Sequence, residues 1–343
     1  MKYLIFLLSL SFFTTFAQST NKSLELVNQG VAQYQEGDFD SAITTFENAL
    51  KLDKDTWQAS YQLGYCYFVK KEYDKAIEYC DIVLDKGEGE FLSRAATIKG
   101  NSLDILGKHE EAVKTYTKAL KKNKKDFMLY YNLSLTYYNQ KNFEKAEENI
   151  INGLKINDKH ASSHLILAYI NYELGKKTQT ILPLFNFLLL ENNSSRSKQA
   201  LTILQQEMVR GVEKKDDKNI NITLGNIGSE FSAAEMTLSL SHANNLSDRE
   251  ENKGKTELDF FIENTSLYFS VLDPGKNEKS FWHEYYVRLF TTLHDKSYVK
   301  SMCYFIHKSS DEKTKIDLWI DENLDTFNAF ADWFNAYERI KNN

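Results

Sequence analysis

Apolar residues recur along residues 23–195 with the spacing of amphipathic helices, and the whole pattern repeats. One small residue of each repeat stands at Ala42, Ala76, Ala112, Ala146 and, replaced by threonine, Thr180. These positions are 34, 36, 34 and 34 residues apart. Another small residue lies twelve positions before each of them, at Gly30, Gly64, Gly100, Ser134 and Ala168. Small residues let two helices approach closely while larger residues fill the space between them, so each repeat is predicted to be a helix pair.

A short phrase leads into the second helix of each predicted pair. It occupies residues 37–42, 71–76, 107–112, 141–146 and, in an eroded form, 175–180. At these residues the sequence resembles the tetratricopeptide repeat family, whose unit is about 34 residues long. The resemblance implies an all-α protein, in which residues 23–195 form a helix-turn-helix solenoid of about five repeats.

The repeats depart from the family pattern in three ways. The proline that often ends a unit is replaced by Lys54, Lys124, Asp158 and Asn192. Two extra residues lie in the loop at 86–90, where we expect the superhelical stacking to shift locally. The fifth unit carries Thr180, Phe187 and Pro183 at unusual positions. Terminal repeats are often atypical, so this unit is predicted to lie near the end of the array.

The chain begins with the features of a secretory signal peptide at residues 1–17. Met1 and Lys2 precede an apolar run over residues 3–16, and small residues lead to Gln18. The run is short for a membrane span, which favours cleavage over a retained anchor. The region around the expected cleavage site has no cysteine, unlike a lipoprotein signal. We therefore expect a mature protein that is exported, and either periplasmic or secreted.

The sequence after the repeats predicts three further regions. Residues 196–213 are expected to form a helix that caps the array. Residues 214–255 are expected to be a linker, with a charged run ending at Lys218, a lone short strand at 220–224 and a helix from Ser229 to Ala243. Residues 256–343 are predicted to form a small helical C-terminal domain around many aromatic residues, with helices near 256–272, 280–294, 296–308 and 311–340, the last open to a break near Asn323. The chain as a whole is similar to uncharacterised secreted repeat proteins of Bacteroidetes-type bacteria.

Composition and motifs exclude several functions. The 343-residue chain has a formal charge of −6, and mild acidity argues against nucleic acid as a partner. His283 and Glu284 begin a zinc-protease pattern, but Val287 stands where its second histidine belongs. The histidines show no metal-ligand spacing, and no phosphate-binding loop or nucleophile elbow occurs. We expect neither a cofactor, nor a metal, nor enzymatic activity.

Three cysteines, Cys66, Cys80 and Cys303, are widely spaced along the chain. Cys66 and Cys80 fall on the two helices of one predicted pair, so a disulfide between them is conceivable in an oxidising compartment. Burial as small apolar side chains is the favoured interpretation, because both fall at packing positions.

In the tetratricopeptide family the first helices of the pairs line the concave face. The resemblance implies that several residues of this chain lie on that face, among them Tyr61, Tyr65, Phe68, Asn101, Tyr131, Tyr138, Tyr169 and Tyr172. Tyrosine offers a broad, stiff contact surface with one hydroxyl group, which suits a peptide or a glycan. Aromatic residues at helical spacing also fill cores, and the C-terminal domain could itself occupy the groove. Of the lysine and asparagine positions that grip a partner's carboxylate in some members, only Asn101 matches, so no carboxylate clamp is predicted.

The favoured hypothesis from the sequence is a protein-interaction scaffold of the bacterial cell envelope, which binds a segment of a protein partner in this groove. The alternative is a glycan-binding or nutrient-capture protein that uses the same tyrosines. A glycan binder predicts tyrosine-dependent retention on polysaccharide, whereas a scaffold predicts tyrosine-dependent recovery of a protein.

Overall fold

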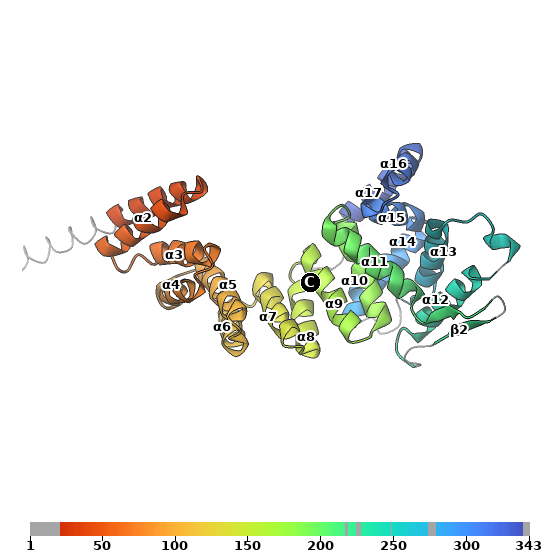
Figure 1. Ribbon diagram of the computed structural model, residues 1–343, viewed down its shortest axis with the longest axis horizontal. Helices are drawn as coiled ribbons and strands as arrows, with labels where there is room; N and C mark the ends of the chain where they lie inside the picture. The colour runs from red at the N-terminus through yellow and green to blue at the C-terminus, as the bar shows by residue number, and fades with distance from the viewer. Residues whose placement is uncertain (1–20, 217–218, 224–227, 248, 274–278, 339–343) are drawn as a thin grey trace, which may run out of the picture. The chain divides into compact units, whose positions relative to one another are not determined.

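The structure is a computed structural model that describes residues 21–216, 219–223, 228–247, 249–273 and 279–338 (Figure 1). The chain divides into two compact units, residues 1–142 and residues 143–343, called unit 1 and unit 2 below. The segment predicted as a signal peptide lies outside the described residues. No helix in the described part of the chain is both long enough and apolar enough to cross a membrane.

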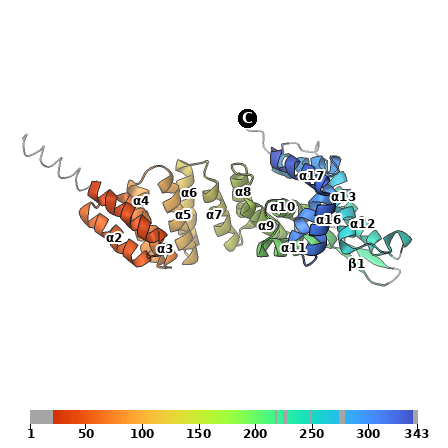
Figure 2. The same ribbon diagram turned by 90° about the horizontal axis from the view of Figure 1, so that it is seen from above.

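Unit 1 is built from antiparallel helix pairs, whose stacking can be followed in Figures 1 and 2. The first helix covers residues 21–35 of the described chain, and the next six are α2 (Phe39–Leu52), α3 (Trp57–Val69), α4 (Tyr73–Lys86), α5 (Glu90–Ile105), α6 (His109–Lys122) and α7 (Phe127–Asn139). Each helix packs against the next, and α5 also contacts both α3 and α7. The helices α3, α5 and α7 therefore lie side by side as the inner layer, as the solenoid prediction requires.

The small residues of the repeat allow two helices to pack closely, as the sequence predicts. A Cβ atom added to Gly100 on α5 would lie 2.3 Å from the ring of Tyr116 on α6, well inside contact distance. Tyr116 is completely buried there. The small residue on one helix thus makes room for the large residue on its partner, and the predicted helix pairing is confirmed.

The two extra residues lie in the loop between α4 and α5, which covers residues 87–89. This loop ends at Gly89, whose φ of +58° is the left-handed conformation that glycine adopts without strain. A shift of the superhelix at this point stays a prediction.

Unit 2 starts with the repeat helices α8 (Phe143–Leu154), α9 (Ala161–Glu173) and α10 (Lys177–Leu190), followed by α11 (Ser195–Val209). After a two-stranded sheet come α12 (Ser232–Asn245), the short 3-10 helix η1 (Glu250–Asn252), α13 (Glu257–Ser270), the π-helical turn η2 (His283–Val287), α14 (Arg288–Asp295) and α15 (Val299–Ile306). The chain ends with η3 (His307–Ser309), α16 (Lys313–Glu322) and α17 (Leu324–Ala336). The last predicted helix, 311–340, is broken at Asn323, which is where the sequence analysis allowed for a break.

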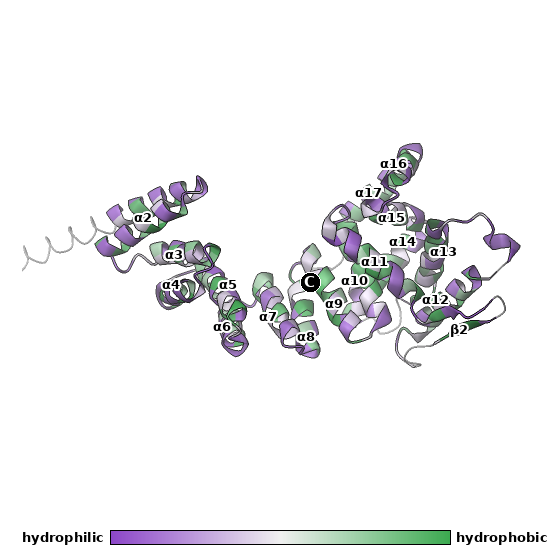
Figure 3. Ribbon diagram, viewed as in Figure 1, coloured by the Kyte–Doolittle hydropathy of each residue, from purple (hydrophilic) through white to green (hydrophobic). Residues whose placement is uncertain are grey.

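Helix α10 is the central helix of unit 2, rather than the outer helix of a terminal repeat. Residues 177–189 of α10 are buried, with the single exception of the half-buried Gln179. Helix α10 contacts α9 and α11, and it also contacts η2, α12 and α15 of the C-terminal region. On one side, Phe185 meets Phe261, Phe269 and Phe290 at ring-centroid distances of 6.0, 5.2 and 5.8 Å. The second part of α10, residues 181–190, is apolar except for Asn186, as expected for a helix that is buried on all sides. Figure 3 colours the helices by hydropathy.

The strand predicted at 220–224 is confirmed over residues 220–222, but the prediction that it has no partner strand is wrong. Strands β1 (Val212–Lys214) and β2 (Ile220–Ile222) pair antiparallel as a hairpin, with Val212 opposite Ile222. Part of the charged run that was expected to be a solvated linker is therefore strand β1. Gly211 closes the base of the hairpin with a φ of +88°, and its carbonyl accepts a hydrogen bond from the Thr223 backbone N–H at 2.7 Å.

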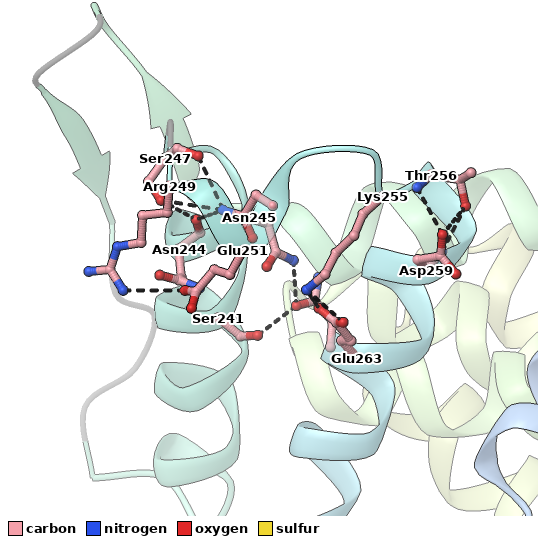
Figure 4. A network of polar contacts seen from close by, with 12 residues as sticks. Ser241, Asn244, Asn245, Ser247, Arg249, Glu251, Lys255, Thr256, Asp259 and Glu263 are labelled. Atoms are coloured by element: carbon pink, nitrogen blue, oxygen red, sulfur yellow. Dashed lines mark hydrogen bonds and ion pairs between the residues drawn. The ribbon is translucent and has the colours of Figure 1, made fainter.

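A network of polar side chains joins α12 to α13 (Figure 4). The buried Asn264 of α13 accepts hydrogen bonds at Oδ1 from Ser241 Oγ at 2.6 Å and from Asn245 Nδ2 at 2.9 Å. At the start of α13, Thr256 and Asp259 form a reciprocal capping box. The helix α12 is thereby fixed to the aromatic core of the C-terminal region.

Candidate interaction surfaces

The first candidate surface is the inner-helix face of unit 1, defined here by residues of α3, α5 and α7. Six of the predicted groove residues lie on it, all of them partly exposed: Tyr61, Tyr65, Phe68, Asn101, Tyr131 and Tyr138. In contrast, Tyr67 and Tyr116, which come from the same repeats, are buried in the cores of the helix pairs. The inner-helix face thus keeps aromatic surface accessible that the helix cores do not use.

The aromatic side chains on α3 are held in place by edge contacts with neighbouring helices. Tyr65 meets Tyr34 at a ring-centroid distance of 5.5 Å, and Tyr61 meets Phe91 at 5.1 Å. The interaction with Tyr65, together with burial, raises the pKa of Tyr34 to about 12. The Arg94 guanidinium has its pKa raised chiefly by a hydrogen bond to Tyr61. These contacts preorganise the rings and so reduce the entropy lost on binding.

Two polar residues of α5, Asn101 and Asp104, have partners within unit 1. Asn101 Oδ1 accepts a hydrogen bond from the Tyr116 hydroxyl at 2.6 Å. Asp104 lies against His109 and accepts a hydrogen bond from Asn139 Nδ2 at 3.1 Å. Asn101 therefore supports the core, and the absence of a carboxylate clamp stays a prediction.

Two apolar residues in equivalent positions extend the inner-helix face. Val69 at the end of α3 is 42% exposed, and Ile105 at the end of α5 is 55% exposed. Each is the last residue of its helix, so they occupy corresponding places in successive repeats. The face therefore presents aliphatic as well as aromatic surface.

The other two predicted groove residues, Tyr169 and Tyr172, lie on α9 in unit 2. Tyr172 is 50% exposed, whereas Tyr169 is partly buried and its pKa is raised by that burial. The C-terminal region docks elsewhere on α9: the buried His164 has its Nδ1 2.7 Å from the Tyr286 hydroxyl. Within unit 2, the C-terminal domain therefore leaves Tyr172 open to solvent.

The three cysteines are free and buried in the structure. Burial raises the pKa of Cys66 to about 11 and that of Cys80 to about 12, and it also raises the pKa of Cys303. Such thiols stay protonated and unreactive near neutral pH. The conceivable disulfide between Cys66 and Cys80 is not present.

Two histidines that were considered as metal ligands from the sequence make structural contacts instead. His160 Nδ1 lies 2.8 Å from Ser163 Oγ, and His283 stacks on Phe231 at a ring-centroid distance of 5.4 Å. Among the residues that the structure describes, no three histidine, cysteine or acidic side chains are grouped so that they could hold a metal ion.

A second candidate surface was not found from the sequence. It is a cavity of about 800 Å³ in unit 2, beside the start of α10. Its charged lining residues, which come from three separate segments, are Lys176, Lys177, Arg210 and Glu235. The one indication of this cavity in the sequence was a pair of lysines, Lys176 and Lys177, at the start of a helix that is mostly apolar.

Comparison with known proteins identifies the repeats. Two models described as "Tetratricopeptide repeat" match residues 27–91 and 129–160, and one described as "TPR repeat" matches residues 100–141. A TPR repeat-containing protein, MJ1428 of Methanocaldococcus jannaschii, is 29% identical over 183 residues, which are 50% of this chain and 32% of that protein. The Hsp70-Hsp90 organizing protein of Triticum aestivum is 32% identical over 100 residues, which are 26% of this chain and 17% of that protein. The matched region thus spans about a third or less of the length of these curated relatives.

Solved structures also match about half of the chain. The PilF protein of Pseudomonas aeruginosa matches with a TM-score of 0.49 and 19% identity, over 55% of this chain and 85% of that one. YrrB, described as a TPR protein with an unusual peptide-binding site, matches with a TM-score of 0.44 and 18% identity, over 55% of this chain and 96% of that one. From the models and curated relatives, the chain carries tetratricopeptide repeats within residues 27–160.

Proposed function

We propose that this protein is a non-enzymatic interaction scaffold, which binds a segment of a protein partner on the inner-helix face of unit 1. The observation that carries the proposal is the row of partly exposed aromatic residues on α3 and α7, next to buried tyrosines in the same repeats. Aromatic residues that are rigidly held and partly exposed are frequent anchors in protein interfaces. The wheat relative is named as an organiser of two other proteins, which agrees with a scaffold role.

The chemistry of the face suggests the kind of segment that binds. Tyrosine rings, Val69 and Ile105 offer apolar contact area, and Asp104 is already paired within the protein. A segment with aromatic or aliphatic side chains and little charge fits such a face better than a strongly acidic or basic one.

A pull-down with matched variants tests this role. The protein carrying Tyr65→Ala and Tyr131→Ala is compared with the wild type in a cross-linked pull-down from envelope extract. A Tyr79→Ala variant is the control, because Tyr79 is a partly buried tyrosine on the second helix of its pair. We expect one protein to be recovered by the wild type and by the control, and to be lost from the double variant at unchanged helicity.

Two results would count against the proposal. Equal recovery of all proteins by the double variant would show that the inner-helix face is not the binding surface. Retention on polysaccharide that depends on the same tyrosines, without a protein partner, would instead support the glycan-binding alternative.

The place of action is part of the same proposal. We infer export to the bacterial envelope, either the periplasm or the medium, from the apolar run at residues 3–16 and the small residues before Gln18. The intact mass of the protein recovered from a bacterial envelope fraction tests this inference. A chain that begins at Gln18 is expected, and a chain that keeps Met1 in the cytoplasm would overturn it.

A further inference from the structure

The cavity in unit 2 has the size and the lining of a small-molecule site. Its volume of about 800 Å³ lies within the range of roughly 300–1,000 Å³ that is common for ligand pockets. It is formed where the end of α9, the start of α10, the turn after α11, the end of β2 and the start of α12 meet. The apolar part of its lining includes Leu174, Ala233 and Met236, and serine side chains contribute polar groups.

Lys177 is the most unusual residue of this lining. It is the first residue of α10 and is only 8% exposed, although lysine is rarely buried. Its Nζ donates a hydrogen bond to the backbone carbonyl of Arg210 at 2.9 Å. An ammonium group has three N–H donors, so this carbonyl alone does not saturate it.

The charges on the cavity wall are predominantly positive. Among the described residues that line it, Lys176, Lys177 and Arg210 are cationic and Glu235 is anionic. Glu235 Oε1 accepts a hydrogen bond from the Thr178 backbone N–H at 3.1 Å, at the amino end of α10.

Two of these cations form ion pairs with carboxylates that are not among the described lining residues of the cavity. Glu147 binds Lys176 at 2.7 Å, and Glu207 binds Arg210 at 3.0 Å, and neither is among the described lining residues. Glu207 is only 2% exposed. The start of α12 adds to the positive field, since Ser232 and Ala233 line the cavity and no side chain in the described residues caps this helix.

We propose that this cavity binds a small organic anion with an apolar body, whose charge is recognised by Lys177 and Arg210. The apolar body rests on Leu174 and Met236, of which Met236 is 47% exposed and so accessible to a ligand. This site is separate from the inner-helix face of unit 1 and does not depend on the scaffold role.

The protonation state of the Lys177 amine allows the site to be tested with a reactive probe. Burial lowers the pKa of Lys177 to about 8, so a fraction of the amine is neutral at neutral pH. Only a neutral amine adds to an aldehyde, and exposed lysines with a pKa near 10.4 are almost entirely charged. A small anionic aldehyde should therefore react first at Lys177.

Pyridoxal 5′-phosphate is a suitable probe, because it is a small aromatic anion with an aldehyde group. The neutral Nζ adds to the aldehyde carbon, and the carbonyl oxygen leaves as water to give an imine. Added borohydride transfers hydride to the imine carbon and fixes a secondary amine. Peptide mapping by mass spectrometry then reports the labelled lysines. We expect saturable labelling of Lys177, at a reagent concentration at least about tenfold below that for the exposed Lys313 of α16.

Competition separates recognition of an anion from simple reactivity of the amine. Benzoate is expected to slow the labelling of Lys177, whereas benzamide, which has nearly the same shape and no charge, is expected to leave it unchanged. Arg210→Gln should raise the concentration for half-saturation about tenfold, while Arg249→Gln, at an exposed arginine outside the cavity, should not. Circular dichroism of each variant checks that unit 2 is folded.

Three outcomes would overturn the proposal. The first is labelling spread over the surface lysines without preference for Lys177, which would mean that Lys177 serves only as a buried donor to the Arg210 carbonyl. The second is equal protection by benzoate and benzamide, which would refute recognition of charge. The third is unchanged labelling in folded Arg210→Gln, which would remove Arg210 from the site.

Discussion

Replacing Lys177 by methionine removes a titrating amine from unit 2 and keeps a long, flexible side chain in its place. Burial lowers the pKa of this amine from its ordinary value of 10.5 to about 8 in the folded protein. Between these two values the unfolded chain binds a proton that the folded protein has released. The free energy of unfolding therefore rises with pH across this window, and the cost of burying the charge is fully present only below about pH 8.

The size of the effect follows from the two pKa values. Between pH 7 and pH 9 the wild type should gain about 1.3 kcal/mol of stability from this group alone. The Lys177→Met variant lacks the titration, so the stability difference between the two proteins should change by that amount. Nearby His242 contributes little in this range, because burial lowers its pKa and leaves it neutral at pH 7 and above.

Unfolding in urea, followed by tryptophan fluorescence at pH 7, 8 and 9, measures this change. Trp57 is the one tryptophan of the sequence in unit 1, while Trp282, Trp319 and Trp333 lie in unit 2. A Trp57→Phe background thus makes the fluorescence report on unit 2. A stability difference that stays constant from pH 7 to pH 9 would show that Lys177 has an ordinary pKa, and it would refute the argument from burial.

Three further substitutions test the packing. Gly100→Ala should destabilise unit 1 by about 1–3 kcal/mol, because the new methyl group would overlap the buried ring of Tyr116; Thr117→Ala, on the exposed face of α6, is the control in the same urea assay. Phe185→Ala should cost unit 2 about 3–5 kcal/mol, since it leaves a cavity among three phenylalanine rings, and a loss below 1 kcal/mol would contradict the central place of α10. Asn264→Ala should cost about 1–3 kcal/mol by leaving Ser241 and Asn245 without their acceptor, and adding Ser241→Ala should recover part of that loss.

The sequence predicts the repeat helices well because their packing is local and periodic. The small residue at Gly100 and the large residue at Tyr116 are sixteen positions apart, and the same relation returns in other repeats. The hairpin was missed because strand β1 is only three residues long and lies within a charged run. Its pairing depends on Gly211, whose left-handed backbone can be seen only in the structure.

The cavity was missed for a related reason. Lys177, Arg210 and Glu235 are far apart in the sequence, and the lysine pair at 176–177 does not by itself indicate a cavity. Only the tertiary fold shows that Lys177 is buried and that Glu235 bonds to the amino end of α10. On the inner-helix face, the sequence identified the aromatic residues but not their intramolecular partners. One such partner is Tyr116, whose hydroxyl donates a hydrogen bond to Asn101.

The unusual sequence of the fifth repeat has a structural cause that leads to a last prediction. Its second helix, α10, must pack on repeat helices and on the C-terminal domain at once, so polar residues that would face solvent in an ordinary repeat are replaced by apolar ones. Phe261, Phe269 and Phe290 of the C-terminal domain pack on Phe185 of this helix. A fragment of residues 256–343 would expose that aromatic surface to water.

We therefore expect this fragment to lack a cooperative unfolding transition, whereas residues 143–343, which form one compact unit, should unfold cooperatively. Urea titration of both fragments by circular dichroism measures the difference. A sharp transition in the shorter fragment would show that the C-terminal helices form an independent domain, and that the apolar sequence of α10 needs another explanation.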